Sequence, residues 1–314
     1  MEQRWIAAVR AHVVLAYFAV AYGVTWMLWL PLVASRQGWW SFDPPEWLHY
    51  AGAAGPVTGA FVVAGLADGR RGWGALLARY RPSKAPLGWL VAAAGSVLAL
   101  SAVGIIATRM ADGAWPSYAD IAKTSNLPAM GLPLTMLVHL LTFGIGEETG
   151  WRGFALPHLQ ERWGALRATA LLYAGWALWH LPSFFENPTY SDWSAGTVVG
   201  WASGLALGAV FLTWLYNSAR GSLLTVVMWH ALFNTVTASE AASTSVVLAA
   251  VVTTGVMAIA VIALIAAGPA ELRGWSRRAG PRVRWSDLMH GLGDKEAGRP
   301  DGRPASSVPL RGAS

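Results

Sequence analysis

The feature that most constrains this sequence is a succession of apolar segments, each long enough to cross a bilayer as a helix. A hydrocarbon core of about 30 Å requires about 20 apolar residues per helix. Because lipid offers no hydrogen-bond partners, a helix must satisfy its backbone groups internally. The sequence therefore predicts an all-α, polytopic membrane bundle of about eight transmembrane helices, at 12–34, 48–66, 87–108, 131–156, 165–184, 196–216, 221–238 and 245–267.

Composition supports this fold class and excludes several functions. Hydrophobic residues make up 54% of the chain and charged residues 13%, about half the charge of a soluble domain. The chain contains no cysteine, which excludes a thiolate nucleophile and a cysteine-ligated zinc. The net charge is +6, but the basic residues lie in loops and the tail, so the lipid bilayer and not nucleic acid is the expected partner.

The distribution of Lys and Arg predicts the orientation of the helices. Cytoplasmic loops collect basic residues, and placing both termini in the cytoplasm puts most of them on that side. Residues 1–267 are expected to form the transmembrane domain, and residues 268–314 a disordered, basic cytoplasmic tail. The stretch 70–81 is predicted either as an amphipathic helix on the inner leaflet or as a solvated loop. With both termini in the cytoplasm, the basic residues that fall on the outer side of the membrane are Arg36, Arg109 and Lys123.

Three of the predicted spans carry ionisable side chains, which are costly in lipid and therefore mark candidate functional sites. Glu147 lies on the fourth span, His180 on the fifth and His230 on the seventh. At 1.5 Å per residue, each lies about 15–22 Å from the cytoplasmic end of its helix. They are expected to form one layer inside the membrane that is reachable from the cytoplasm.

The two adjacent glutamates are expected to have different roles, because neighbouring residues on a helix point about 100° apart. Glu148 and Arg152 are four residues apart in the order that favours an ion pair, so they are predicted to be structural. Glu147 shares its helix face with Phe143 and Trp151. Its buried carboxylate is the predicted general base.

His230 and Asn234 are also four residues apart and project toward one point. Both side chains can donate hydrogen bonds to the oxyanion of a tetrahedral intermediate. A carboxylate, two imidazoles and an amide together suit the hydrolysis of a peptide bond. The other membrane histidines are expected to be ordinary inter-helix hydrogen-bonding groups, with His158 at an interface: His12, His49 and His139.

These residues form three motifs, and in this order the motifs resemble those of the CPBP family of intramembrane peptidases. The family includes type II CAAX prenyl endopeptidases and bacterial, Abi-like relatives linked to bacteriocin processing and immunity. The resemblance covers about residues 130–240. The family patterns Glu-Glu-x-x-x-Arg, Phe-x-x-x-His and His-x-x-x-Asn correspond to Glu147-Glu148 with Arg152, to Trp176 with His180, and to His230 with Asn234.

The resemblance implies that Glu147 and His180 activate a water and that His230 and Asn234 hold the oxyanion. Trp176 departs from the family's phenylalanine, an aromatic exchange expected to preserve the chemistry and to alter the shape of the cavity. Members are often labelled metalloproteases, and Glu147, His180 and His230 would be the zinc ligands in that alternative. The metal-free reading is preferred because no His-Glu-x-x-His helix is present and asparagine is a poor zinc ligand.

The sequence therefore predicts a multi-pass cell-membrane endopeptidase with its active site open toward the cytoplasm. Its expected substrate is the C-terminal region of a membrane-associated, CAAX-like protein or peptide. Two alternatives stay open. One is a proton- or ion-coupled transporter, since buried Glu and His side chains also form proton relays. The other is a non-catalytic immunity or scaffold protein that retains the pocket.

Overall fold

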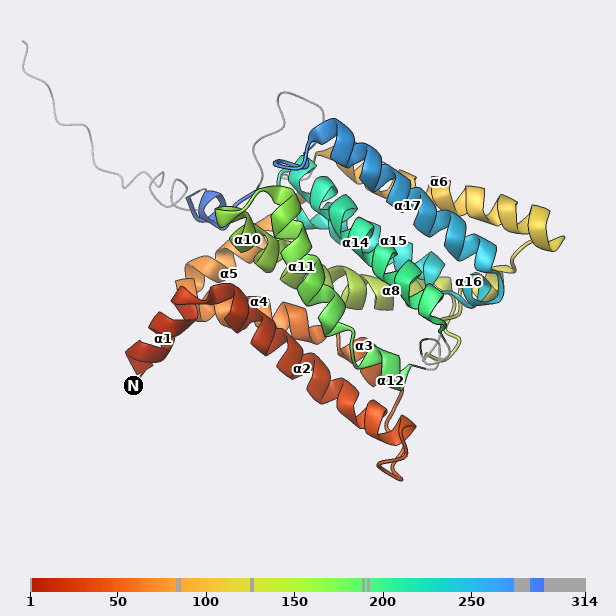
Figure 1. Ribbon diagram of the computed structural model, residues 1–314, viewed down its shortest axis with the longest axis horizontal. Helices are drawn as coiled ribbons and strands as arrows, with labels where there is room; N and C mark the ends of the chain where they lie inside the picture. The colour runs from red at the N-terminus through yellow and green to blue at the C-terminus, as the bar shows by residue number, and fades with distance from the viewer. Residues whose placement is uncertain are drawn as a thin grey trace, which may run out of the picture.

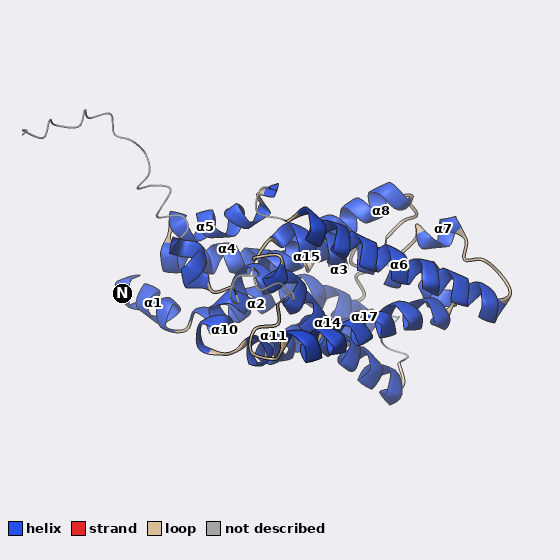
Figure 2. Cartoon of the chain, turned by 90° about the horizontal axis from the view of Figure 1, so that it is seen from above, coloured by secondary structure: helices blue, strands red, loops and turns tan. Residues whose placement is uncertain are grey.

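The prediction of an all-α, polytopic bundle is confirmed. Within the described ranges the chain forms helices and connecting turns, and its one pairing of extended residues is an isolated bridge between Thr124 and Ser239. Figure 2 shows these helices and loops from above. The computed structural model describes residues 2–82, 86–124, 127–187, 190, 193–273 and 283–290.

Among the described residues, five helical spans are long and apolar enough to cross a membrane. The second of them joins two helices, α3 (Leu48–Ala51) and α4 (Ala54–Asp68). A further apolar helix, α15 (Leu223–Thr237), is shorter. The other four spans are α2 (Val13–Arg36), α6 (Leu87–Asp112), α14 (Ala195–Ser218) and α17 (Val246–Ala267).

The fourth predicted span is helical but repeatedly changes its hydrogen-bond pattern. Two π-helical turns interrupt it, and π-turns inside α-helices occur frequently at functional sites. Both glutamates lie where the first π-helix ends. The successive pieces are α8 (Leu132–His139), η3 (Leu140–Glu147), α9 (Glu148–Gly150), η4 (Trp151–Ala155) and α10 (Leu156–Arg162).

Glycines let this irregular helix lie directly against α4. A Cβ at Gly146 would lie 2.7 Å from the carbonyl oxygen of Ala53, and one at Gly150 would lie 2.6 Å from that of Pro56. Small residues allow such close backbone contact between membrane helices. The contact places the segment that carries the glutamates in the interior of the bundle.

The fifth predicted span, 165–184, is wrong at its C-terminal end. The helix, α11 (Ala165–Trp179), stops one residue before His180, and a separate turn, α12 (Ser183–Glu186), follows. Pro182 has no amide to donate and disfavours helical geometry at the residue before it. His180 therefore lies at a helix end, not within a continuous span.

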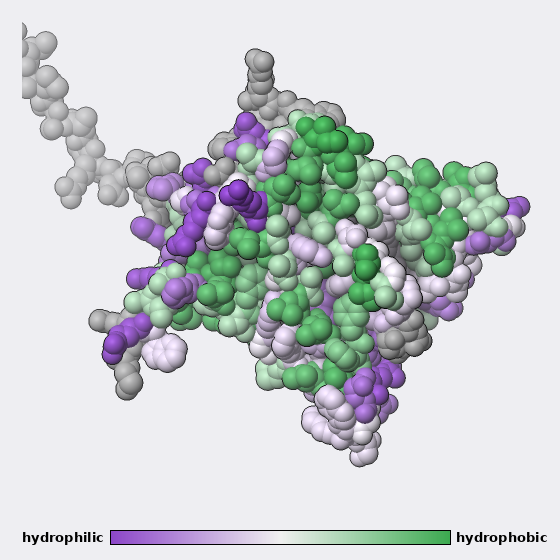
Figure 3. Space-filling view, viewed as in Figure 1, coloured by the Kyte–Doolittle hydropathy of each residue, from purple (hydrophilic) through white to green (hydrophobic). Residues whose placement is uncertain are grey.

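The ends of the bundle differ in polarity. Figure 1 shows α1 (Glu2–Ala11), α5 (Arg70–Leu77) and α10 together at one end, whereas α16 (Glu240–Thr244) lies away from it. In Figure 3 hydrophilic residues gather at that end and hydrophobic residues cover much of the middle. This distribution is typical of a multi-pass membrane protein, in which lipid contacts the apolar side chains.

The outer faces of the long helices carry large apolar side chains that no other element covers. These side chains are mostly more than half exposed, which would be costly in water and suits contact with lipid tails. They include Leu15, Met27, Leu98, Ile106 and Ile265.

The stretch 70–81 is helical, since α5 continues into a short 3-10 helix, η1 (Ala78–Tyr80), while its place on the inner leaflet stays a prediction. Trp73 and Leu77 are exposed on it. Arg79, in contrast, is only 1% exposed. The segment therefore combines a surface face with one buried cation.

Part of the expected C-terminal tail packs on the bundle. The carbonyl of Val283 accepts a bond of 2.7 Å from Gln160 Nε2, and the indole N–H of Trp285 donates to Asp68 at 3.0 Å. The Gly, Pro and Arg content of the tail predicted disorder throughout, because composition is an average that does not register single residues such as Val283 and Trp285. Of the expected tail, residues 268–273 and 283–290 are described, and 274–282 and 291–314 lie outside the described residues.

Candidate active site

Glu147 is held by two tryptophans on different helices. Its Oε2 accepts hydrogen bonds from Trp151 Nε1 at 3.1 Å and from Trp176 Nε1 at 2.9 Å. The side chain is 2% exposed. Two indole donors on one oxygen fix the orientation of the carboxylate and leave Oε1 to act on another group.

Glu148 is fully buried and joins two partners through its Oε1. Arg152 donates to it at 2.8 Å, which confirms the predicted ion pair. His230 Nδ1 contacts the same oxygen at 2.7 Å, which sequence reasoning missed because the i, i+4 rule detects only partners on one helix. Glu148 therefore orients a candidate catalytic histidine as well as neutralising a buried arginine.

His230 and Asn234 lie one helical turn apart on α15, as predicted. The ring of His230 is 5% exposed and packs edge-on against Trp176, with centroids 5.8 Å apart. Because Glu148 engages Nδ1, Nε2 is the ring nitrogen left for other contacts. Asn234 is half-buried.

His180 has its tautomer set by the main chain. Its Nδ1 lies 2.8 Å from the carbonyl oxygen of Trp176. A carbonyl can only accept, so Nδ1 carries the proton and Nε2 of the neutral ring has a free lone pair. The ring packs against Trp179 and Trp201, with centroids 4.8 and 5.5 Å away. His180 is thus arranged to accept a proton through Nε2.

Trp176 connects the three motifs. Trp176 donates a hydrogen bond to Glu147, and the centroid of its ring lies 4.5 Å from the guanidinium carbon of Arg152. The centroids of the Trp176 and His180 rings are 5.9 Å apart. The sequence predicted only that this aromatic residue would shape the cavity. Its indole N–H does more, because a phenylalanine could not make the bond to Glu147.

His49, His139 and His158 have the kinds of contacts expected of structural groups, whereas His12 is exposed and its role stays a prediction. His139 Nδ1 lies 3.0 Å from Thr235 Oγ1, and His49 Nδ1 lies 2.6 Å from Glu186 Oε1. His158 stacks on Trp285 at 4.4 Å, at the interface with the C-terminal segment.

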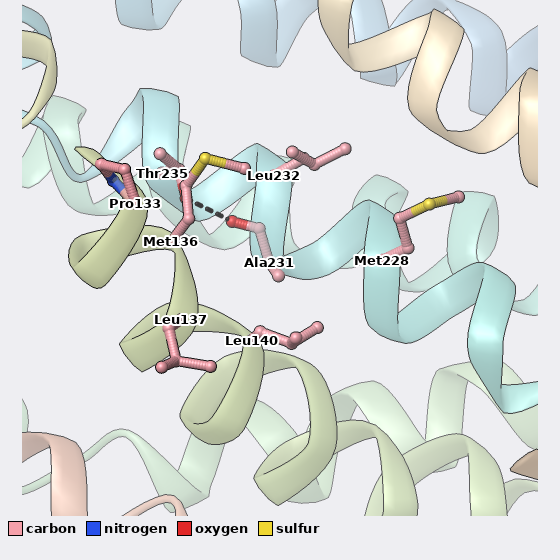
Figure 4. Close-up of a pocket in the computed structure, with 8 residues that line it drawn as sticks. All are labelled: Pro133, Met136, Leu137, Leu140, Met228, Ala231, Leu232 and Thr235. Carbon is pink, nitrogen blue, oxygen red and sulfur yellow. Dashed lines mark hydrogen bonds between the residues drawn. The ribbon is translucent and has the colours of Figure 1, made fainter.

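A separate apolar pocket of about 360 Å³ lies between α8 and α15. Figure 4 shows its walls, which come from the beginning of the irregular helix and from one face of α15. Glu147, His180, His230 and Asn234 do not line it. The lining residues are Pro133, Met136, Leu137, Leu140, Met228, Ala231, Leu232 and Thr235.

The zinc alternative requires Glu147, His180 and His230 to converge on one ion. Among the described residues, no three His, Cys, Asp or Glu side chains are grouped so that they could hold a metal ion.

The fold and the side-chain cluster define a class: a multi-pass helical membrane protein with two buried carboxylates, two oriented imidazoles and an amide on three neighbouring helices. Comparison with known proteins finds a family that matches one part of the chain. Residues 129–236 match the family model for type II CAAX prenyl endopeptidases, Rce1-like. A relative named CAAX prenyl protease 2, from Methanococcus maripaludis, is 30% identical over 103 residues.

Together, the match and the relative show that residues 129–236 are similar to the CPBP/CAAX protease family. The aligned part covers 32% of this chain and 38% of the relative. The residues matched by the family model, 129–236, include all seven residues of the three motifs. The resemblance expected from the motifs is therefore confirmed for this region.

Proposed function

We propose that the protein is an intramembrane endopeptidase that cleaves a membrane-associated protein or peptide near its C-terminus. The observation that carries the proposal is the contact chain that joins all three motifs. Trp176 Nε1 bonds to Glu147, its ring packs on His230, and His230 bonds to Glu148. A transporter or scaffold does not require an acid, a base and hydrogen-bond donors in one cluster.

In the proposed reaction, Glu147 and His180 activate a water. Glu147 Oε1 or His180 Nε2 takes a proton as the water oxygen attacks the peptide carbonyl. The carbonyl π electrons move to oxygen and form the tetrahedral oxyanion. Collapse of the intermediate breaks the C–N bond, and the protonated base returns the proton to the leaving amine.

His230 and Asn234 are assigned to the oxyanion. When the imidazole is doubly protonated, Nδ1 donates to Glu148 and Nε2 donates to the oxyanion, so the Glu148 carboxylate stabilises the charged ring. The Asn234 amide supplies a second donor. Glu148, Arg152 and Trp176 act by holding these groups in place.

The proposed setting is the cell membrane, with the site open toward the cytoplasm and both termini on that side. Basic residues support this orientation, because α1, α5 and α10 share one end of the bundle. The substrate class follows from the relative, whose name specifies a CAAX prenyl protease. Whether the substrate of this chain carries a prenyl group is an outcome of the following experiment.

The test compares membranes that contain the wild-type protein, Glu147→Gln or Glu240→Gln, by mass spectrometry of released peptides. Glu240 provides the matched control, because it is an exposed glutamate outside the cluster. We expect short C-terminal fragments from wild type and Glu240→Gln, and a loss of about 10²- to 10⁴-fold in Glu147→Gln. Identical fragments from all three would refute the peptidase, and Glu147-dependent ion flux in liposomes would favour the transporter.

A further inference from the structure

Pro157 leaves one carbonyl group of the irregular helix without its usual donor, either that of Gly153 or that of Arg152. In an α-helix the amide of residue 157 would bond to the carbonyl of Gly153, and in a π-helix to that of Arg152. Proline has no amide hydrogen to offer either. Both acceptor residues are buried, and an unsatisfied buried carbonyl costs free energy.

Arg79 supplies the missing hydrogen bond from another part of the chain. Its Nη1 donates to the Gly153 carbonyl and lies 3.4 Å from the Arg152 carbonyl oxygen. The same nitrogen contacts the hydroxyl of Tyr216 at 2.5 Å. A side chain on η1 therefore bonds to both of these carbonyls, including the one that Pro157 leaves without a donor.

The surroundings of Arg79 show that these bonds are its main polar contacts. Among the described residues no carboxylate forms an ion pair with it, and its Nε and Nη2 have no partner. Its guanidinium faces the rings of Trp285 at 5.3 Å and Tyr216 at 5.9 Å. Burying a cation without a counter-ion is costly, so its placement here is best explained by the carbonyls it serves.

The turn that Arg79 supports carries two groups of the site. Trp151 and Arg152 belong to η4, and they donate to Glu147 and Glu148 respectively. A shift of the main chain at Arg152 and Gly153 would move both donors. Arg79 itself lies outside the matched residues 129–236.

We propose that Arg79 is a positioning residue, which replaces the amide that Pro157 lacks and so holds η4 where Trp151 and Arg152 meet the two glutamates. Its catalytic consequence rests on the proposed peptidase function. Its effect on the main chain does not.

A double-mutant cycle on the full-length protein tests this role. Arg79→Met removes the donor, and Pro157→Ala restores an amide. Two quantities are measured: hydrogen exchange of the amides in 151–162, and kcat and KM per folded molecule. Arg10→Met is the matched control, because Arg10 also donates to a carbonyl, that of Ala67, at 2.8 Å.

We expect Arg79→Met to raise exchange in 151–162 and to lower kcat, each about 10-fold, as expected for one lost charged hydrogen bond. KM should stay within about 3-fold, since substrate binding does not use Arg79. Adding Pro157→Ala should recover most of both losses. Arg10→Met should change neither.

Two results would overturn the proposal. One is Arg79→Met with unchanged exchange and unchanged kcat per folded molecule. The other is a double variant whose hydrogen exchange and kcat are no closer to wild type than those of Arg79→Met. If Arg79→Met does not fold, a double variant that also does not fold has the same meaning. If the wild-type protein cleaves no peptide, the proposed function fails, and the exchange data alone decide whether Arg79 positions η4.

Discussion

Two membrane segments of this chain, α17 and the irregular helix at 132–162, begin from similar apolar sequences and end as different structures. α17 is a regular helix over Val246–Ala267 without a charged residue. The irregular helix alternates between α- and π-turns and holds Glu147, Glu148 and Arg152. α17 therefore serves as scaffold, and the irregular helix carries candidate site residues.

The comparison shows what a buried polar site requires of a membrane helix. A regular helix satisfies its own backbone and packs through side chains alone, as α17 does against α6. The irregular helix depends on partners from elsewhere: the indole of Trp176, the imidazole of His230 and the guanidinium of Arg79. Substitutions should therefore affect function in the irregular helix and only stability in α17.

The largest effect is expected for Glu148→Gln, which leaves Arg152 buried without its counter-charge. Breaking a buried pair from one side costs about 3–5 kcal/mol. Thermal unfolding in detergent should show this loss, and the released His230 should abolish cleavage. The control is Glu46→Gln, whose 2.5 Å pair with Arg36 is exposed and should contribute about 0–1 kcal/mol. Equal effects of the two substitutions would contradict the assignment.

An intermediate effect is expected for Trp176→Phe, which keeps the ring and removes the donor to Glu147 Oε2. Losing this hydrogen bond should lower kcat about 10-fold with little change in KM. Trp229→Phe is the control, because the buried Trp229 Nε1 has no partner among the described residues. Full activity in Trp176→Phe would show that the indole bond is dispensable.

The smallest effect on function is expected for Val252→Ala on α17. Val252 is fully buried and packs near Gly104 of α6. The variant should lose about 1–3 kcal/mol of stability through the cavity it creates. Activity per folded molecule should stay at the wild-type value, measured with the peptides released in the membrane assay. A changed kcat would show that the scaffold and the site are coupled.

Local sequence rules predicted much of the site. Helical spacing identified the Glu148–Arg152 pair and put His230 and Asn234 one turn apart on the same helix. The cost of burying charge singled out Glu147 and His180. The catalytic roles of these residues stay predictions.

Other features lay beyond local rules because they depend on which helices become neighbours. Spacing along α15 contains no information that His230 meets Glu148, which is 82 positions away. The same holds for Arg79 and the carbonyls before Pro157. The end of α11 before His180 is different, since Pro182 was a visible signal that an apolar-window prediction ignores.

The sequence by itself determined that this chain is a helical membrane protein. Its apolar segments have the length of a helix that crosses the bilayer, and a helix satisfies its own backbone hydrogen bonds in lipid. It also determined which side chains are too costly to be buried without a function. Only the tertiary structure decided how those side chains pair, because the rotation and contact of each helix are set by packing against the others. Glu147, Glu148 and Arg79 each have a partner in a distant part of the chain: Trp176, His230 and the carbonyls of the irregular helix, respectively.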